Sequence, residues 1–221
     1  MSKSRSHALA RRTSRTAPAG RPAGEAEVAK LLGENIRGLR RAQGLTLEDV
    51  ATRCHLSVGF LSQVEQGKKR PSTAALQRIS ETLKVAVGFF FPQDPTADPR
   101  ESGVVVRRRQ RRRLSYSALG STDYLNEVDY LLSPTLNGRQ MMTLVDFEPG
   151  GSTGDDLYHH EGEECGFILS GRLELHLAED VFLLETGDSF SFKSDVPHRY
   201  VNPGPGKAEL VMVNTPVVIP Y

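Results

Sequence analysis

The sequence has few cysteines and no long apolar run, and each shortage excludes a class of protein. Only two cysteines are present, Cys54 and Cys165, and they show no CxxC spacing. A disulfide framework and a zinc knuckle both need paired or clustered cysteines, so neither is predicted. No apolar run approaches the roughly 18–20 residues of a membrane-spanning helix, and the N-terminus lacks the apolar segment of a secretory signal. We therefore expect a soluble, cytoplasmic protein that does not contact a membrane.

Acidic residues are missing from the first 24 positions, and this absence exposes an uneven charge distribution. Residues 1–24 contain six Lys or Arg, residues 25–92 contain ten against seven acids, and residues 93–221 contain twelve against twenty acids. The net charge of +1 therefore hides a basic front half and an acidic back half. A basic half of this kind favours a module that binds a polyanion, joined to a second module of another kind.

Composition and periodicity divide the 221 residues into four segments. Residues 1–24 hold few large apolar side chains and predict a disordered basic arm, although an organelle transit peptide has a similar composition. Residues 25–92 show helical apolar spacing and predict an all-α domain of four or five short helices. Residues 93–103 are rich in proline and charge and predict a linker. Residues 104–221 break into short β-type runs separated by Gly, Pro and Asn, which predict an all-β sandwich or barrel.

The most specific signal is the stretch LTLEDVATRCHLSVGFLSQVEQGKKRPS, which starts at Leu45. Thr46 and Ser57 stand at the N-cap positions of two short helices that a tight turn separates. In the second helix, Leu61 and Val64 face inward, which leaves small and amide side chains on the outer face. Such a surface can approach a DNA groove, where Gln pairs with adenine edges. The alternative is a generic helical bundle with a solvated basic run.

These motifs resemble the lambda-repressor-like (XRE-type) helix-turn-helix family over residues 28–91. The resemblance implies a five-helix domain that binds double-stranded DNA and uses residues 57–66 as its recognition helix. It also implies that Arg40 pairs with Glu65 beneath the turn as structural support. The residues expected to contact DNA are Thr46, Ser57, Val58, Ser62, Gln63, Lys68, Lys69 and Arg70.

The stretch YHHEGEECGFILSG, which starts at Tyr158, concentrates imidazoles and carboxylates. Residues two apart on a strand share a face, so we expect Tyr158 and His160 on one face and His159 on the other. The EGEE segment can turn the chain and bring Glu164 back, and a later Gly- and Pro-containing segment supplies His198. Imidazoles with one carboxylate are a common ligand set for Zn, Fe, Mn or Ni. The alternative is a charged hairpin with solvated histidines.

The spacing of these residues resembles the two motifs of the cupin family, over residues 104–219. The matching positions are Glu164 and Gly171 in the first motif, and Gly187, Pro197, His198 and Asn202 in the second. The resemblance implies a double-stranded β-helix, or jelly-roll barrel, and makes His160, Glu164 and His198 three of four metal ligands. Tyr158 stands where the family has its first His, so a metal site and an effector pocket lined by these four residues both stay open.

Two smaller expectations concern the same half. The basic run at residues 107–113 is flanked by VVV and LSY, which favours an opening strand over a nuclear signal or a second nucleic-acid patch. Cys165 directly follows Glu164 and has the opposite strand parity, which favours a buried thiol over a redox sensor.

The combination resembles a group of bacterial one-component transcription regulators. In that group the cupin domain dimerises the protein and binds a small-molecule effector, and the front domain binds a palindromic operator. For this chain the resemblance implies a homodimer that is not an enzyme, with residues 92–103 as the hinge. The alternatives are a DNA-tethered cupin metalloenzyme of oxygenase or isomerase type, and a DNA binder whose barrel only dimerises. The sequence does not identify the effector or the operator.

Overall fold

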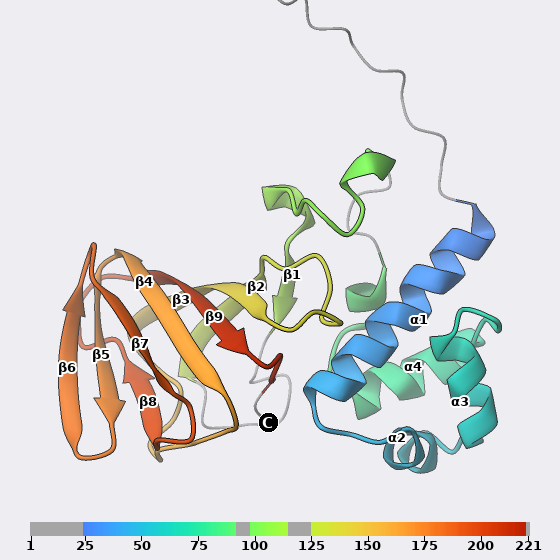
Figure 1. Cartoon of the computed structure of the whole chain (residues 1–221), viewed down its shortest axis with the longest axis horizontal. Helices are drawn as coiled ribbons and strands as arrows, with labels where there is room; N and C mark the ends of the chain where they lie inside the picture. Colours follow the sequence, from blue (N-terminus) through green and yellow to red (C-terminus); the bar gives the residue numbers. More distant parts are fainter. Residues whose placement is uncertain (1–23, 92–97, 115–124, 220–221) are drawn as a thin grey trace, which may run out of the picture.

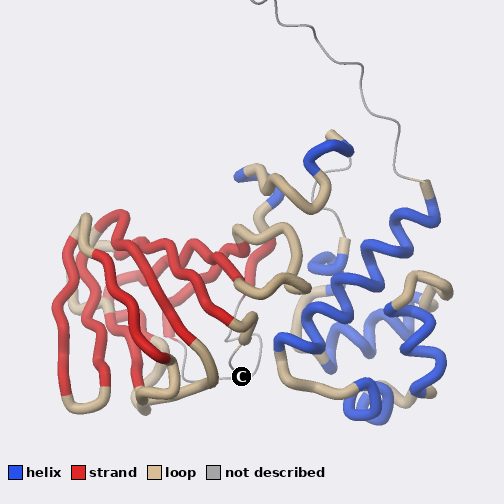
Figure 2. The backbone as a smooth tube through the Cα atoms, viewed as in Figure 1, coloured by secondary structure: helices blue, strands red, loops and turns tan. Residues whose placement is uncertain are grey.

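The computed structural model describes residues 24–91, 98–114 and 125–219. Figure 1 shows a helical domain on one side of the molecule and a β-barrel on the other. Figure 2 shows that the α-helices lie in the first domain and the strands of the sheet in the second. The predicted arm lies outside the described residues except for Gly24, and so do residues 92–97 of the predicted linker region. None of the described helices combines the length and apolar character that crossing a membrane needs.

The helical domain contains four α-helices and a short 3₁₀ helix. They are α1 (Glu25–Ala42), α2 (Leu47–Arg53), α3 (Val58–Glu65), α4 (Thr73–Thr82) and η1 (Val87–Phe90). The predicted N-caps of α2 and α3 are confirmed, because Thr46 and Ser57 each accept a backbone N–H of the helix that follows. Ser72 caps α4 in the same way. The fifth element is not an α-helix. Phe91 is extended (ψ 154°) and precedes a proline, which disfavours the helical conformation and ends η1.

Within the described residues, the barrel consists of nine antiparallel strands in one continuous sheet. They are β1 (Arg112–Leu114), β2 (Leu125–Leu131), β3 (Met141–Ser152), β4 (Glu163–Ser170), β5 (Arg172–Leu177), β6 (Asp180–Glu185), β7 (Ser189–Lys193), β8 (His198–Val201) and β9 (Ala208–Thr215). The order is β6-β5-β8-β3-β9-β4-β7, and β2 joins β3 to β1. Alternate side chains of β3 and β9 are buried, which builds an apolar core around Phe147, Leu173 and Leu210. The predicted all-β architecture is confirmed.

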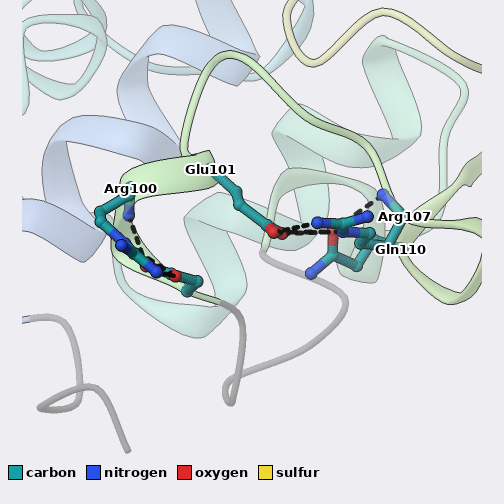
Figure 3. Close-up of polar contacts among 5 residues, drawn as sticks. Arg100, Glu101, Arg107 and Gln110 are labelled. Carbon is teal, nitrogen blue, oxygen red and sulfur yellow. Dashed lines mark hydrogen bonds and ion pairs between the residues drawn. The ribbon is translucent and has the colours of Figure 1, made fainter. Parts of the chain in front are cut away.

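The segment before β1 corrects two expectations. Residues 107–113 do not form an opening strand, because Arg108–Gln110 is a 3₁₀ helix and β1 begins only at Arg112. Figure 3 shows why: the Arg107 guanidinium turns back to the Glu101 carboxylate, and its backbone N–H donates to Gln110 Oε1 (3.1 Å). Arg100 likewise donates to Asp98. These local charge pairs fold residues 98–110 into turns, whereas the sequence pattern had predicted an unstructured linker end and a strand.

Cys165 is also placed differently from the expectation. Its parity is opposite to that of buried Glu164, as predicted, but the thiol is exposed. The outer face of β4 is not covered there by any other described segment, and its outward neighbour Phe167 is 46% exposed. The expectation of a buried thiol was therefore wrong, because strand parity decides the direction of a side chain but not whether another layer covers it.

The two domains share one hydrophobic core. Leu136 and Ile219, from the barrel domain, belong to the same buried cluster as Ile36 and Leu39 of α1. A Cβ at Gly38 would lie 3.1 Å from Leu136 Cβ, which shows how closely α1 approaches the loop after β2.

Hydrogen bonds reinforce this docking. The backbone N–H of Ile219 donates to the Ala42 carbonyl (3.0 Å), and Asn137 Nδ2 donates to the Glu34 carbonyl (3.0 Å). Arg112 donates to Asn35 Oδ1 (3.0 Å). All three contacts lie between Glu34 and Ala42, so the second half of α1 holds the two domains together.

Candidate effector site and DNA interface

The outer face of α3 is free of packing contacts on the side predicted to read DNA. Leu61 and Val64 are fully buried, whereas Val58 is 43% exposed and Gln63 is exposed. The helix begins at Ser57, whose Oγ accepts the Phe60 N–H (3.2 Å), and ends before Gly67, whose φ of 69° favours glycine.

The basic residues after α3 differ in their surroundings. Lys68 and Lys69 are exposed, and Lys69 Nζ lies 5.7 Å from the centroid of the Phe60 ring. Arg70 instead donates to the Glu25 carbonyl (2.6 Å) and forms an ion pair with the Glu25 carboxylate. Arg70 therefore contacts the start of α1, and the two lysines are the better placed of the three for phosphate contacts. Thr46 is similarly engaged, since its side chain completes the α2 capping box.

A buried ion pair supports the turn between α2 and α3. Arg40 of α1 donates to both carboxylate oxygens of Glu65, at 2.7 and 3.0 Å, and to the Leu45 carbonyl (2.7 Å). Arg40 is 7% exposed and Glu65 is 6% exposed. The structure therefore contains the support that the family resemblance implied, and it joins the last residue of α3 to α1.

Inside the barrel, His160, Glu164 and His198 bring one ligand atom each to within 4.8 Å of one another. His160 Nε2 lies 2.7 Å from Glu164 Oε1, and His198 Nε2 lies 3.5 Å from the same oxygen. His198 is fully buried and Glu164 is 2% exposed. The three predicted ligands thus converge, although they come from the loop before β4, from β4 and from β8.

Strand pairing explains how these residues meet. Tyr158 and His198 exchange two backbone hydrogen bonds, of 3.0 and 2.8 Å, in an isolated bridge. This places the Tyr158 ring centroid 4.3 Å from that of His198 and 6.3 Å from that of His160. His159 is exposed. The predicted parity is therefore what the structure has: Tyr158 and His160 share the inner side, and His159 faces away.

Both carboxylate oxygens of Glu164 accept hydrogen bonds from neighbouring side chains. Asn214 Nδ2 donates to Oε1 (2.8 Å) and the Tyr200 hydroxyl donates to Oε2 (2.7 Å). Burial alone would raise the pKa of Glu164, but the hydrogen bond from His160 and the neighbouring His198 imidazole outweigh it and hold the pKa at about 2. Burial would lower the pKa of His160, yet its contacts with Glu164 and with the Glu161 carbonyl raise it. The two groups therefore favour each other's charged form, carboxylate and imidazolium.

The donor set fits a divalent metal. His198 Nδ1 lies 2.8 Å from the Val196 carbonyl and His160 Nδ1 lies 3.1 Å from the Glu161 carbonyl, so each carbonyl orients an imidazole with Nε2 toward the cluster. His198 Nε2 is buried and makes no hydrogen bond within the described residues. Two imidazole nitrogens and a carboxylate are a ligand set for Zn, Fe, Mn or Ni. The cluster could therefore hold any one of these four ions.

Two family models match the chain, a cupin domain over residues 143–214 and a helix-turn-helix domain over residues 31–87. The HTH-type transcriptional regulator PuuR of Escherichia coli (strain K12) is 25% identical over 184 residues, covering 83% of this chain and 94% of PuuR. The uncharacterized HTH-type transcriptional regulator y4dJ of Sinorhizobium fredii is 37% identical over 71 residues, covering 32% of this chain and 92% of y4dJ. The chain belongs to the helix-turn-helix transcriptional regulators.

Both matches lie inside the predicted domains of this regulator, whose boundaries at residues 25–92 and 104–221 stay predictions. Among solved structures, the hydroxypropylphosphonic acid epoxidase from S. wedmorenis aligns with the regulator at a TM-score of 0.42 and 20% identity, covering 84% of this chain and 97% of that chain. A similarity at this level supports no inference about the chemistry of the barrel.

Sequence reasoning missed part of the regulator's barrel interior. Strand β2 was not predicted, and with it Glu127 and Asp129 were not considered. Asn214, the donor to Glu164 from β9, was also missed. The alternation of apolar and acidic residues in LNEVDYL is a signal that could have found β2, but it does not show which face of the strand is buried.

Proposed function

We propose that this transcriptional regulator binds a small-molecule effector inside its barrel, in the site formed by Tyr158, His160, Glu164 and His198, and that the effector changes operator affinity. The observation that carries the proposal is the convergence of three ligand groups, of which Glu164 and His198 are buried and His160 is partly buried, in a barrel that docks directly on the DNA-binding domain. A group of this kind is costly to bury and is typical of a binding or metal site. The regulator acts as a homodimer on a palindromic operator, with one recognition helix for each half-site.

Strand β9 offers a short route between the two sites. At one end Asn214 donates to Glu164, and five residues later the Ile219 N–H donates to the Ala42 carbonyl at the end of α1. The same helix carries Arg40, which holds the end of α3. An effector that changes the hydrogen bonds of Glu164 would therefore bias the position of α1, and DNA would bias effector binding by the same factor. This route supports coupling through the docked interface, while the hinge at residues 92–103 stays a prediction because residues 92–97 are not described.

The test is a thermal-shift screen of metabolites and divalent metals, followed by operator-binding titrations with each hit. We expect at least one hit to change operator affinity, and Glu164→Gln to reduce that response. Glu163→Gln, on the exposed face of β4, is the matched control. If no bound compound changed operator affinity, the barrel would be a dimerisation module only.

A metal-dependent enzyme is a second candidate, because the His160, Glu164 and His198 donor set could hold Zn, Fe, Mn or Ni. A bound ion would supply a Lewis acid at this site. Tyr158 stands where the cupin motif has another His, which supports a sensor more than a catalyst. Metal analysis of the purified protein and of Tyr158→His separates the two. A stoichiometric metal together with turnover of a substrate would favour the enzyme; effector binding without turnover would favour the sensor.

A further inference from the structure

The outside of the barrel carries an apolar surface that is partly open to solvent. It lies on three neighbouring strands, β3, β9 and β4. The strand register arranges its side chains in two rows across these strands, which are Met142, Val213 and Cys165 in the first row and Leu144, Val211 and Phe167 in the second. We refer to these six residues as the apolar outer face.

The side chains of the apolar outer face point away from the barrel core. Successive strand residues alternate between the two faces of a sheet, and the alternate residues Val145, Leu210 and Ile168 are exposed by no more than 1%. On the outside, Phe167 is 46% exposed and Met142 is 38% exposed. The described α-helices lie on the other side of the molecule from β4 (Figure 1). An antiparallel sheet commonly has one apolar and one polar face, so a second apolar face indicates a further contact.

The apolar outer face is uncharged, although the half of the chain that carries it is acidic. Residues 93–221 contain twelve Lys or Arg against twenty acids, so two copies of this half have net charges of the same sign. Charged side chains begin beyond the second row, where Lys207 pairs with Asp146 (2.7 Å) and lies 3.9 Å from Glu209. An apolar centre with a polar margin is the usual arrangement of a protein–protein interface.

The sheet around the apolar outer face is large enough for a stable interface. The rows continue without charge onto β7 with Ser191 and Ser189, and onto β2 with Tyr130. Five strands about 4.8 Å apart are roughly 20 Å wide, and the eight residues of β4 are about 27 Å long. The projected area is of the order of 500 Å², within a factor of two of the about 800 Å² that each partner buries in a standard interface.

A second copy of this chain fits the apolar outer face. A two-fold interface brings the same surface of both copies together, so this surface has to be complementary to itself. A charged surface meets its own sign across such an axis, whereas two uncharged apolar rows do not. The exposed residues Val58 and Gln63 of α3 belong to the other domain, so contact through the barrel leaves them available to DNA.

We propose that two copies of this chain associate through the apolar outer face, with β3, β9 and β4 of one copy packed against the same strands of the other. The proposal rests on the function proposed above, which needs two recognition helices, and it names the surface that joins them. It also places Cys165 inside the contact. The thiol that is exposed in a single chain is therefore covered in the pair.

The first experiment uses Cys165 of the unaltered full-length chain as a reporter. The chain has two cysteines, and Cys54 is fully buried, so a bulky maleimide reports on Cys165. Labelling rates are measured over a range of protein concentrations, beside analytical ultracentrifugation of the same samples. We expect labelling to slow at the concentrations at which the dimer forms, and the labelled protein to sediment as a monomer. Equal labelling rates of monomer and dimer would overturn the proposal.

The second experiment compares two substitutions of exposed apolar residues by lysine. Phe167→Lys should raise the dissociation constant of the dimer about a hundredfold or more, because the interface would then bring two like charges together. Leu183→Lys is the matched control, since Leu183 is 53% exposed on β6, opposite Glu174 of β5 and outside the apolar outer face. It should leave the dissociation constant unchanged. Far-UV circular dichroism checks that both variants are folded.

Three results of the second experiment would overturn the proposal. They are an unaltered chain that stays monomeric at high concentration, a Phe167→Lys variant that dimerises normally, and dissociation caused by Leu183→Lys instead. The labelling of Cys165 needs no variant, so it decides the question even if Phe167→Lys does not fold.

Operator titrations separate this proposal from the function that it rests on. If Phe167→Lys dissociates the dimer but leaves the affinity for a palindromic operator unchanged, the surface is correct and binding of the operator by a homodimer is wrong. If Phe167→Lys remains a dimer and an effector still changes its operator affinity, the regulator responds as proposed and the surface is wrong.

Discussion

At the scale of single residues, the barrel interior contains carboxyl groups with opposite electrostatic surroundings. Glu164 is buried, but its hydrogen bonds with His160, His198 and Tyr200 outweigh burial and lower its pKa to about 2. Desolvation of Glu127, followed by the negative charges of Asp129 and Glu164, raises its pKa well above the usual value. Two carboxyl groups in one interior with pKa values pushed apart are a feature of functional sites.

The first prediction concerns the pH dependence that Glu164 creates. Its folded pKa of about 2 lies below the ordinary value of 4.5, so its stabilisation is present above pH 4.5 and is lost as pH falls toward 2. The shift corresponds to about 3 kcal/mol of unfolding free energy. In urea denaturation of chelator-treated protein, we expect unaltered protein to exceed Glu164→Gln by that order at pH 7, and the gap to close near pH 2. A gap that does not change with pH would contradict this account.

The second prediction concerns Glu127 and has the opposite sign. Because its folded pKa is raised, the folded state binds more protons than the unfolded state above the usual pKa, and stability falls as pH rises. Between pH 4.5 and neutral pH, unaltered protein should therefore lose stability relative to Glu127→Gln. Urea denaturation at several pH values measures this difference. If Glu127→Gln were the less stable protein at neutral pH, the carboxyl group would have an unrecognised partner.

At the scale of elements, the helix-turn-helix depends on a pair that is remote in sequence. Arg40 and Glu65 are separated by 25 positions and meet in the interior, where both are satisfied by several hydrogen bonds. Removing one partner of such a pair leaves a buried charge.

The third prediction follows from that pair. Glu65→Ala should reduce the free energy of unfolding by about 3–5 kcal/mol, because it leaves the Arg40 charge buried without its partner. Glu34→Ala is the matched control, since Lys30 and Glu34 form an exposed pair with a separation of 3.9 Å. The control should change stability by less than about 1 kcal/mol. Equal effects of the two changes in chemical denaturation would show that burial does not matter here.

The fourth prediction distinguishes base recognition by α3 from phosphate contacts made by the lysines that follow it. Gln63→Ala should lower the ratio of specific to nonspecific DNA affinity, at a cost of about 1–3 kcal/mol for the operator. Lys69→Ala should weaken binding to all sequences and reduce the slope of affinity against salt by about one ion. Fluorescence titrations with operator and random duplexes over a range of salt measure both. If neither substitution changed DNA affinity, α3 would not be the helix that contacts DNA.

At the scale of the whole molecule, the two domains are predicted to unfold together, because one hydrophobic cluster includes residues of both. Leu136→Ala should destabilise the protein by about 2–5 kcal/mol and separate the calorimetric transition into two. Leu169→Ala, on the outer face of β4 at 40% exposure, should leave a single transition. Two separate transitions in the unaltered protein would show that the interface does not couple the domains.

What the sequence determined by itself is local or periodic. Capping residues identify where helices start because their hydrogen bonds span three residues, and strand parity assigns Tyr158 and His160 to one side because successive side chains alternate. The motif spacing was enough to identify both families and to nominate the three groups that converge in the barrel.

Only the tertiary structure decided which of these groups are buried, and what faces them. It brought Glu127 within electrostatic reach of Asp129 and Glu164, exposed Cys165, turned residues 98–110 through local ion pairs and joined α1 to Ile219. Each of these outcomes depends on contacts between distant segments or on whether another layer covers a face. Periodicity shows the direction of a side chain, and only packing decides its partner.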